Sequence, residues 1–280
     1  MPGTLHVVAT PLGHLDDLSP RAEDTLKGAA LIACEDTRRT AKLLAHCGIA
    51  KPMIAVHKFS ERERLDEVLA VLSRGQDVAL VSDGGTPGLS DPGALLVAAA
   101  HRAGMRVSPV PGPSAAAAIL SVSGLPGERF VFDGFLPARE GSRRNRLREL
   151  AEEPRTIVLY EAPHRVKAAL SDMARVWGER AIVFGRELTK IHETVFRGSA
   201  DAILARLGEG DVKGEIVMAV EGYDGAAPAA ADDGLDRTWG AALASAGGDT
   251  RAALKAVAKE LGIKKPELWR RLAERGLIRD

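Results

Sequence analysis

One glycine- and proline-rich stretch, VSDGGTPGLSDPG (81–93), carries two carboxylates, Asp83 and Asp91, directly after an apolar run. Glycine permits close backbone approach and positive φ angles, and proline stiffens the chain between them. In open α/β sheets, ligands bind at loops that follow the carboxyl ends of strands. The stretch lacks the lysine of a Walker loop and the G-x-G-x-x-G spacing of a dinucleotide loop. Its acidic character suits a ligand with hydroxyl, ammonium or sulfonium groups, bound by Asp83, whereas Asp91 is expected to cap the next helix.

Two further loops are expected beside this one, because each follows a strand of the same sheet. The stretch PVPGPSAAAAI (109–119) contains stiffening prolines, and its serine and alanines let a helix pack close to a ligand. The stretch TPLGHLDDLS (10–19) follows the first expected strand. Rigid loops at neighbouring strand tips predict a ligand cleft.

Short apolar runs alternate with helical patterns through the first 113 residues. This alternation predicts parallel strands joined by right-handed crossovers, and nearly continuous apolar runs are typical of strands buried on both faces. The expected strands are 4–10, 31–35, 53–57, 77–82 and 106–110, and the expected helices are 19–29, 36–48, 61–75 and 93–104.

The pattern changes after a helix expected at 114–124. Strands are expected at 129–136, 155–162, 180–188, 192–199 and 214–222, with helices near 140–152, 164–177 and 199–208. The third and fourth of these strands are too close for a crossover, which predicts a hairpin in a mixed sheet. The sequence therefore predicts an N-terminal α/β domain (1–113), a second α/β domain (114–222), a linker (223–234) and a helical C-terminal unit (235–280).

Two short helices joined by GIKK give the C-terminal unit the spacing of a helix-turn-helix, with Asp249 as an N-cap, Gly262 at the turn and Leu268 in the gap. Such spacing is also common in three-helix units that serve as a solvated cap or a dimerisation element, so nucleic-acid contact is one of two open interpretations. The basic residues of the unit are Arg251, Lys255, Lys259, Lys264, Lys265, Arg270, Arg271, Arg275 and Arg279.

Bulk composition gives few constraints on function. The chain has 280 residues and a formal net charge of zero, so charge alone predicts neither a nucleic-acid nor a membrane partner. Its two cysteines, Cys34 and Cys47, are expected to be reduced thiols, and no metal site is expected. We expect no signal peptide and no membrane span, and therefore a cytoplasmic protein.

Six ordered motifs resemble those of the ribosomal RNA small subunit methyltransferase I family, which belongs to the tetrapyrrole methylase superfamily. They are ATPLGHLDDLSPRA, CEDTRRTAKLL, LVSDGGTPGLSDPG, VPGPSA, YEAPHR and KGEIVMAVEG, and the resemblance extends over about 4–222. It implies a homodimer of two-domain subunits with S-adenosylmethionine bound in the cleft between the domains. It also implies methylation of the ribose 2′-hydroxyl of a cytidine in 16S ribosomal RNA of the small subunit.

The resemblance also implies a set of cofactor-binding residues. Those of the first domain and the adjoining loop are Asp83, Gly85, Thr86, Pro87, Pro111, Pro113 and Ser114, and those of the second domain are Tyr160, Ala162, Glu215 and Ile216. The chain departs from the family pattern at Gly84, where alanine is usual, and at His14 and Ser60, where asparagine is usual.

Transfer of a methyl group to a hydroxyl requires a proton acceptor, and RNA requires cations for its phosphates. Glu35 and Asp36 follow a strand and precede two arginines, which makes Glu35, Asp36 and Arg38 the catalytic candidates. Helix capping by Asp36 and a surface ion pair for Arg38 remain alternatives. The candidate RNA contacts on this ground are Arg39, Arg139, Arg143, Arg144 and Arg146, and the resemblance adds His57 and Glu61. Glu61 is also a weaker candidate for the base.

Two other functions are compatible with parts of the sequence. A methyltransferase of the same fold could act on a small tetrapyrrole, although such enzymes usually carry G-x-G-P-G where this chain has TPLGHL. A DNA-binding regulator could use the C-terminal unit to bind DNA and the α/β domains to sense a ligand. The arginine-rich stretch at 136–150 and the basic C-terminal unit favour RNA over the tetrapyrrole. A short C-terminal unit after two full domains is an unusual layout for a DNA-binding regulator.

Overall fold

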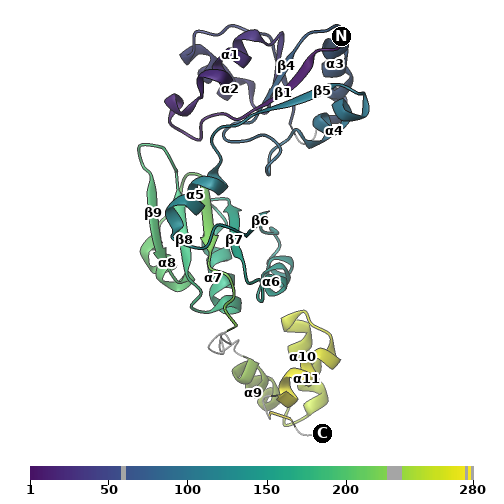
Figure 1. The fold of residues 1–280 in the computed structure, drawn as a ribbon. Coiled ribbons are helices and arrows are strands. Elements are labelled where there is room, and N and C mark those ends of the chain that lie inside the picture. Colours follow the sequence, from purple (N-terminus) through teal and green to yellow (C-terminus); the bar gives the residue numbers. More distant parts are fainter. Residues whose placement is uncertain (58–60, 226–234, 275–276, 279–280) are drawn as a thin grey trace.

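The computed structural model describes residues 1–57, 61–225, 235–274 and 277–278. Figure 1 shows three parts stacked along one axis, with the first sheet at the top, the second sheet in the middle and the C-terminal helices at the bottom. Ser60, Arg275 and Arg279, together with most of the expected linker, lie outside the described residues.

The first sheet has five strands in the order β3-β2-β4-β1-β5, and all its pairings are parallel, as predicted. The central strand β4 is buried at every position. The strands are β1 (Thr4–Val8), β2 (Leu31–Cys34), β3 (Met53–Ala55), β4 (Val78–Val81) and β5 (Arg106–Val110). All five lie where the apolar runs predict them, but four end one to two residues earlier, because the tips of the runs enter the loops.

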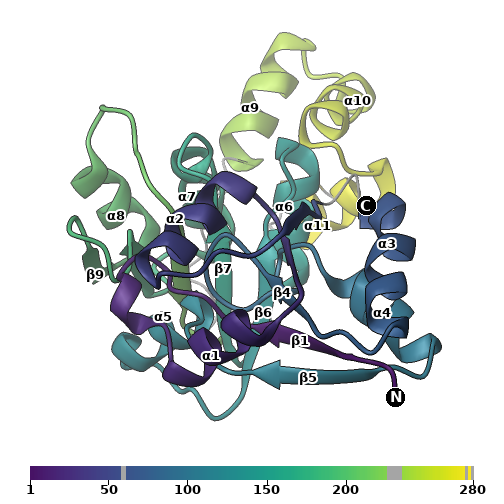
Figure 2. The same ribbon diagram turned by 90° about the horizontal axis from the view of Figure 1, so that it is seen from above.

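Helices cover both faces of this sheet, as Figure 2 shows from above. α1 (Pro20–Gly28) and α2 (Thr37–His46) pack on one face, and α3 (Glu61–Ser73) and α4 (Ala94–Arg102) on the other. Ser19 is the N-cap of α1, because its side chain accepts a hydrogen bond from the backbone N–H of Ala22 and Pro20 begins the helix.

The second sheet is mixed, with the order β6-β7-β10-β8-β9. β6 and β7 are parallel, and the other pairings are antiparallel. The predicted hairpin is confirmed by the antiparallel pair β8 and β9. The strands are β6 (Phe130–Phe135), β7 (Thr156–Glu161), β8 (Ile182–Arg186), β9 (Thr194–Gly198) and β10 (Ile216–Val220).

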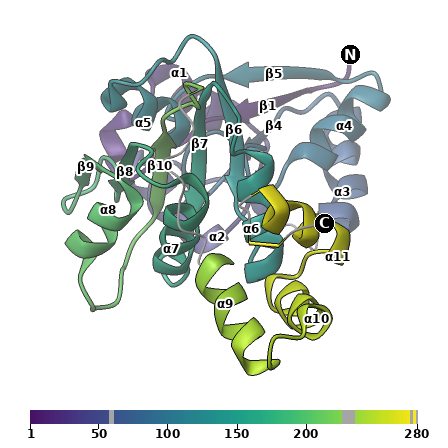
Figure 3. The same ribbon diagram turned by 90° about the horizontal axis from the view of Figure 1, so that it is seen from below.

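Helices α6 (Glu140–Glu149), α7 (Val166–Trp177) and α8 (Ala200–Leu207) cover one face of the second sheet, and α5 (Ala115–Ser123) covers the other. Figure 3 shows α6, α7 and α8 from below, and Figure 1 shows α5 on the side of the first domain. Because α5 packs on the second sheet, we propose that the domain boundary lies at 113–114, so that residues 1–113 are the first domain and 114–222 the second.

The C-terminal unit contains α9 (Leu235–Ser245), α10 (Thr250–Leu261) and α11 (Lys265–Glu274), which share a core that includes Trp239 and Leu268. Two residues predicted to mark helix ends in this unit are confirmed. The Asp249 side chain accepts hydrogen bonds from the backbone of α10, and Gly262 ends that helix with a φ of 64°. Left-handed backbone at this position favours glycine.

Candidate active site

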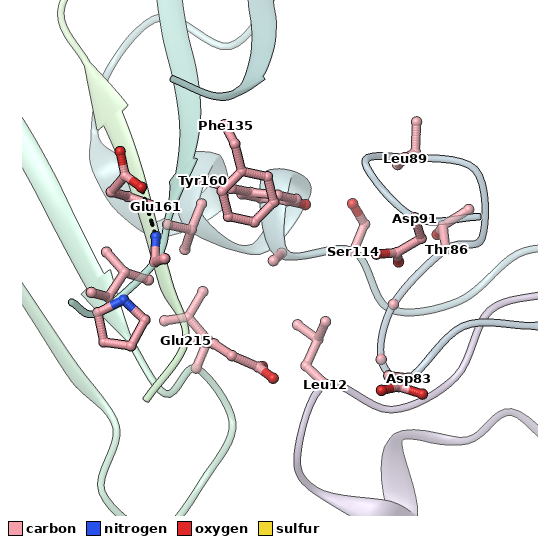
Figure 4. Close-up of a pocket in the computed structure, with 18 residues that line it drawn as sticks. Leu12, Asp83, Thr86, Leu89, Asp91, Ser114, Phe135, Tyr160, Glu161 and Glu215 are labelled. Carbon is pink, nitrogen blue, oxygen red and sulfur yellow. Dashed lines mark hydrogen bonds between the residues drawn. The ribbon is translucent and has the colours of Figure 1, made fainter. Parts of the chain in front are cut away.

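A cavity of about 320 Å³ lies between the two domains, at the carboxyl ends of β4 and β7. Figure 4 shows residues of the first domain facing residues of the second across this space. The lining residues are Leu12, Asp83, Gly84, Gly85, Thr86, Leu89, Asp91, Ser114, Ala115, Phe135, Tyr160, Glu161, Ala162, Pro163, Leu188, Glu215, Ile216 and Val217. The cavity therefore lies where the sequence predicts a ligand cleft.

The glycine-rich loop after β4 is fixed by hydrogen bonds to its neighbours. Thr10 and Gly85 exchange two backbone hydrogen bonds of 2.9 Å, and the Thr86 hydroxyl donates to the carbonyl of Pro113 at 3.1 Å. Gly85 has a φ of 89°, and a Cβ there would lie 3.3 Å from Leu12. The three predicted loops thus form one rigid wall, and Gly85 is required by its backbone angle.

Asp83 connects this wall to the segment that holds the catalytic candidates Glu35, Asp36 and Arg38. Its Oδ1 accepts a hydrogen bond from the backbone N–H of Asp36 at 3.0 Å, and its Oδ2 lies 3.5 Å from Nε of Arg39. Burial raises the pKa of the Asp83 carboxyl above its ordinary value. Asp83 therefore lines the cavity and also positions the start of α2.

The expected cap of α4 is wrong, because Glu61 rather than Asp91 supplies it. The Glu61 side chain is 5% exposed, and its Oε1 accepts hydrogen bonds from the backbone N–H groups of Gly93 at 3.2 Å and Leu96 at 2.9 Å. A buried carboxylate that caps a helix does not reach RNA, so Glu61 is neither a substrate contact nor the base. Asp91 is left to line the cavity, where burial and the nearby charge of Glu35 raise its pKa to about 6.

The two adjacent candidate carboxylates lie in different environments. Asp36 caps α2, and Nε and Nη2 of Arg38 donate to its two oxygens at 3.1 and 2.7 Å. These hydrogen bonds hold the pKa of Asp36 well below its ordinary value. Burial and the charge of Asp83 instead raise the pKa of Glu35. Both alternatives kept open from the sequence are thus observed, since Asp36 is a cap and Arg38 its ion-pair partner.

The second domain provides an aromatic and aliphatic wall. Tyr160 packs edge-on against Phe132 and Phe135, with ring centroids 4.9 and 5.8 Å apart. Tyr160 and Phe135 both line the cavity and give this wall an aromatic, apolar surface suited to a planar ring. Glu161 lies at the end of the same strand and is paired with Nε of Arg165 at 3.0 Å.

Glu215 closes the other side of the cavity. Its carboxylate lies 3.1 Å from Nζ of Lys190 and 3.5 Å from Nη1 of Arg39. Arg39, expected from the sequence to contact RNA, is thus held between Asp83 and Glu215 while its side chain stays 57% exposed.

Eight of the eleven residues expected to bind the cofactor line the cavity. They are Asp83, Gly85, Thr86, Ser114, Tyr160, Ala162, Glu215 and Ile216. Pro87, Pro111 and Pro113 are outside the lining; Pro113 contributes only the carbonyl that anchors Thr86. Ten lining residues were not predicted to bind the cofactor. Phe135 and Leu188 lie outside the six family motifs, and Glu161 resembles an ordinary strand residue. The others are Leu12, Gly84, Leu89, Asp91, Ala115, Pro163 and Val217.

The arginine run of α6 is largely engaged within the protein. Arg143 is 6% exposed, and its Nε and Nη2 contact Asp172 of α7 at 2.8 and 2.6 Å. Arg144 contacts the other oxygen of Asp172 at 2.7 Å, and Arg146 pairs with Asp133 and Glu149. Arg143 is therefore a structural residue and not an RNA contact. Arg139 and His57 are exposed.

The described residues form neither a metal site nor a membrane span. Within them, no group of three or more histidines, cysteines, aspartates or glutamates is arranged to hold a metal ion. Across the same part of the chain, no helix combines the length and apolar character that crossing a bilayer requires.

The family model for tetrapyrrole (corrin/porphyrin) methylases matches residues 4–204. The chain is 53% identical to a protein named ribosomal RNA small subunit methyltransferase I from Xylella fastidiosa (strain Temecula1 / ATCC 700964), over 79% of this chain and 82% of that one. It is 46% identical to the protein of the same name from Escherichia coli O157:H7, over 79% of this chain and 78% of the relative.

Solved structures share the fold at lower identity. A diphthine synthase superposes with a TM-score of 0.61 at 16% identity, covering 79% of this chain and 90% of that one. A uroporphyrin-III-C-methyltransferase from Thermus thermophilus superposes with a TM-score of 0.55 at 22% identity, covering 79% and 93%. The family match and the solved structures agree with the fold. The chain belongs to the tetrapyrrole methylase family, in the group of methyltransferases named ribosomal RNA small subunit methyltransferase I.

Proposed function

We propose that this protein transfers a methyl group from S-adenosylmethionine to the ribose 2′-hydroxyl of a cytidine in 16S ribosomal RNA. The observation that carries the proposal is the cavity between the domains, which combines carboxylates on one wall with an aromatic wall opposite. The names of the close relatives support the substrate class.

The residues of the cavity fit S-adenosylmethionine in size and in chemistry. A volume of about 320 Å³ is in the range of small-molecule sites. Tyr160, Ile216 and Val217 would hold the adenine against apolar surface. Asp83 would favour a positively charged sulfonium or ammonium group.

S-adenosylmethionine supplies an activated methyl group, so the protein has to bind, align and exclude water. The bridge between Thr10 and Gly85 and the hydrogen bond from Thr86 to Pro113 keep the first wall rigid. Asp83 fixes the start of α2, which presents Arg39 at the mouth of the cavity. Exposed cations such as Arg39 and Arg139 would contact RNA phosphates.

We further propose that the protein is a cytoplasmic homodimer. Strand β6 pairs only with β7 among the described strands, and it exposes Phe130 and Phe135 at 42% and 51%. An apolar edge of this kind is covered in most proteins. Small-subunit RNA, the proposed substrate, supports the cytoplasmic location.

The proposed function is tested with labelled methyl donor and three substrates, namely undermethylated small subunits, naked small-subunit RNA and a precorrin. We expect label in RNA that survives alkali as a 2′-O-methyl dinucleotide. Asp83→Ala should raise the dissociation constant of S-adenosylmethionine at least about tenfold, because a charged hydrogen-bonding group is lost. Asp66→Ala, an exposed change on α3, is the matched control. Label only in the tetrapyrrole would contradict the proposal.

A further inference from the structure

Four carboxylates line the cavity, and three of them are neutralised by cations. Asp83 lies 3.5 Å from Arg39, Glu161 lies 3.0 Å from Arg165, and Glu215 lies 3.1 Å from Lys190. Asp91 is the exception. In the described part of the chain, no lysine, arginine or histidine lies within the 4.0 Å ion-pair distance of its carboxylate.

The groups that face Asp91 come from several elements, and none carries a positive charge. Glu35 follows β2, Asp83 follows β4 and Glu215 precedes β10, so all three acidic neighbours oppose ionisation of Asp91. The nearby Ser82 hydroxyl, which donates a hydrogen bond to the carbonyl of Gly85 at 3.4 Å, favours the ionised form of Asp91. Burial and, to a smaller extent, the charge of Asp91 raise the pKa of Tyr160 on β7. Figure 4 shows the Asp91 side chain beside Thr86 of the first domain and Ser114, the first residue of the second domain.

The other acidic candidates are less suited to receive a proton from a substrate. Both oxygens of Asp36 are occupied by Arg38, and Asp36 does not line the cavity. Glu35 also lies outside the lining. The Glu161 side chain is fully buried and held by Arg165. Asp91 thus combines access to the cavity with a carboxylate free of a cationic partner, and a pKa of about 6 matches a base that works near neutral pH.

We propose that Asp91 is the general base of the methyl transfer, a role that rests on the proposed function. An oxygen of the Asp91 carboxylate accepts the proton of the ribose 2′-hydroxyl. The hydroxyl oxygen forms a bond to the methyl carbon as the carbon–sulfur bond breaks. The electron pair of that bond stays on sulfur, which leaves as a neutral thioether, and the products are the methyl ether and protonated Asp91.

The test compares the wild type with Asp91→Asn in single-turnover methylation of undermethylated small subunits at saturating donor, from pH 5.5 to 8.5. We expect Asp91→Asn to lower the rate at pH 7.5 about 100-fold or more, which is the usual contribution of a general base. The dissociation constant of S-adenosylmethionine should stay within about threefold. The wild-type rate should rise through about pH 6 and then level off, and the variant should lack this rise.

Calorimetric binding of the donor and thermal melting show whether Asp91→Asn is folded, and Asp66→Asn on the exposed face of α3 is the matched control. A rate within threefold of the wild type would overturn the proposal. So would a loss that arises only from weaker donor binding, which would make Asp91 a counter-ion of the cofactor. If the wild type is active and the variant is equally active, only this proposal fails. If the wild type labels no RNA, the proposed function fails and takes this role with it.

Discussion

Nη1 of Arg39 lies 3.5 Å from the carboxylate of Glu215, and this ion pair joins α2 of the first domain to the start of β10 in the second. Arg39 also lies 3.5 Å from Asp83, so one guanidinium connects two carboxylates on opposite sides of the cavity. Its charge offsets part of the negative charge that the cavity presents to a ligand.

Arg39→Met should make the cavity more negative and so favour a positively charged ligand. We expect the affinity for S-adenosylmethionine, relative to that for the neutral product S-adenosylhomocysteine, to rise about 1.5- to 5-fold, as for other partly exposed ion pairs. Calorimetry with both ligands measures this ratio. Arg102→Met, on the exposed end of α4, serves as the control. An unchanged or lower ratio would show that Arg39 does not set the charge of the site.

Gly85→Ala should destabilise the protein and weaken donor binding together. A side chain at a φ of 89° is strained, and its Cβ would lie 3.3 Å from Leu12 in the opposing loop. We expect a loss of about 1–3 kcal/mol in the free energy of unfolding, measured by denaturant titration. Gly28→Ala is the matched control, because it ends α1 with nothing within 4 Å of the added Cβ. Equal effects of the two substitutions would contradict the proposed rigidity of the loop.

Substitution of Arg143 and of Arg139 should distinguish a structural arginine from one that contacts RNA. Arg143→Ala leaves Asp172 buried with only Arg144 as a partner, which should lower the free energy of unfolding by about 3 kcal/mol. Arg139→Ala should leave the melting temperature unchanged. It should weaken RNA binding and reduce the salt dependence of that binding by about one phosphate contact. Loss of RNA affinity for Arg143→Ala without loss of stability would reverse this assignment.

Local sequence signals predicted most of the fold. Ser19, Asp249 and Gly262 mark helix ends through hydrogen bonds and backbone angles within a few residues, so their roles were readable from spacing alone. The continuous apolar run of β4 predicted a parallel strand buried on both faces for the same reason. The hairpin of β8 and β9 followed from the short connection between them.

The errors came from contacts between residues far apart in the chain. Asp91 stands two residues before Gly93 and looks like the cap of α4, yet Glu61 reaches that helix from 35 positions before Leu96. Arg143 lies in a run of arginines that resembles a solvated face, and only the packing of α7 shows that Asp172 buries it. No local pattern encodes either partner, so the sequence could identify the loops of the site but not which carboxylate stays unpaired.

Asp91→Asn should stabilise the folded protein at neutral pH, because the native carboxylate is ionised in a partly buried, acidic site. The folded pKa of about 6 lies above the ordinary value of about 4, so the unfolded chain releases this proton at lower pH than the folded chain. The resulting destabilisation is absent below about pH 4, develops between about pH 4 and 6, and is complete above that range. We expect Asp91→Asn to gain about 1–3 kcal/mol at pH 7.5, with the advantage shrinking towards pH 4.5. Thermal melting of both proteins at the two pH values measures this. Lower stability of the variant at pH 7.5 would mean that the Asp91 carboxylate stabilises the loop. If Asp91 serves function at the expense of stability, the variant should gain stability and lose methylation rate.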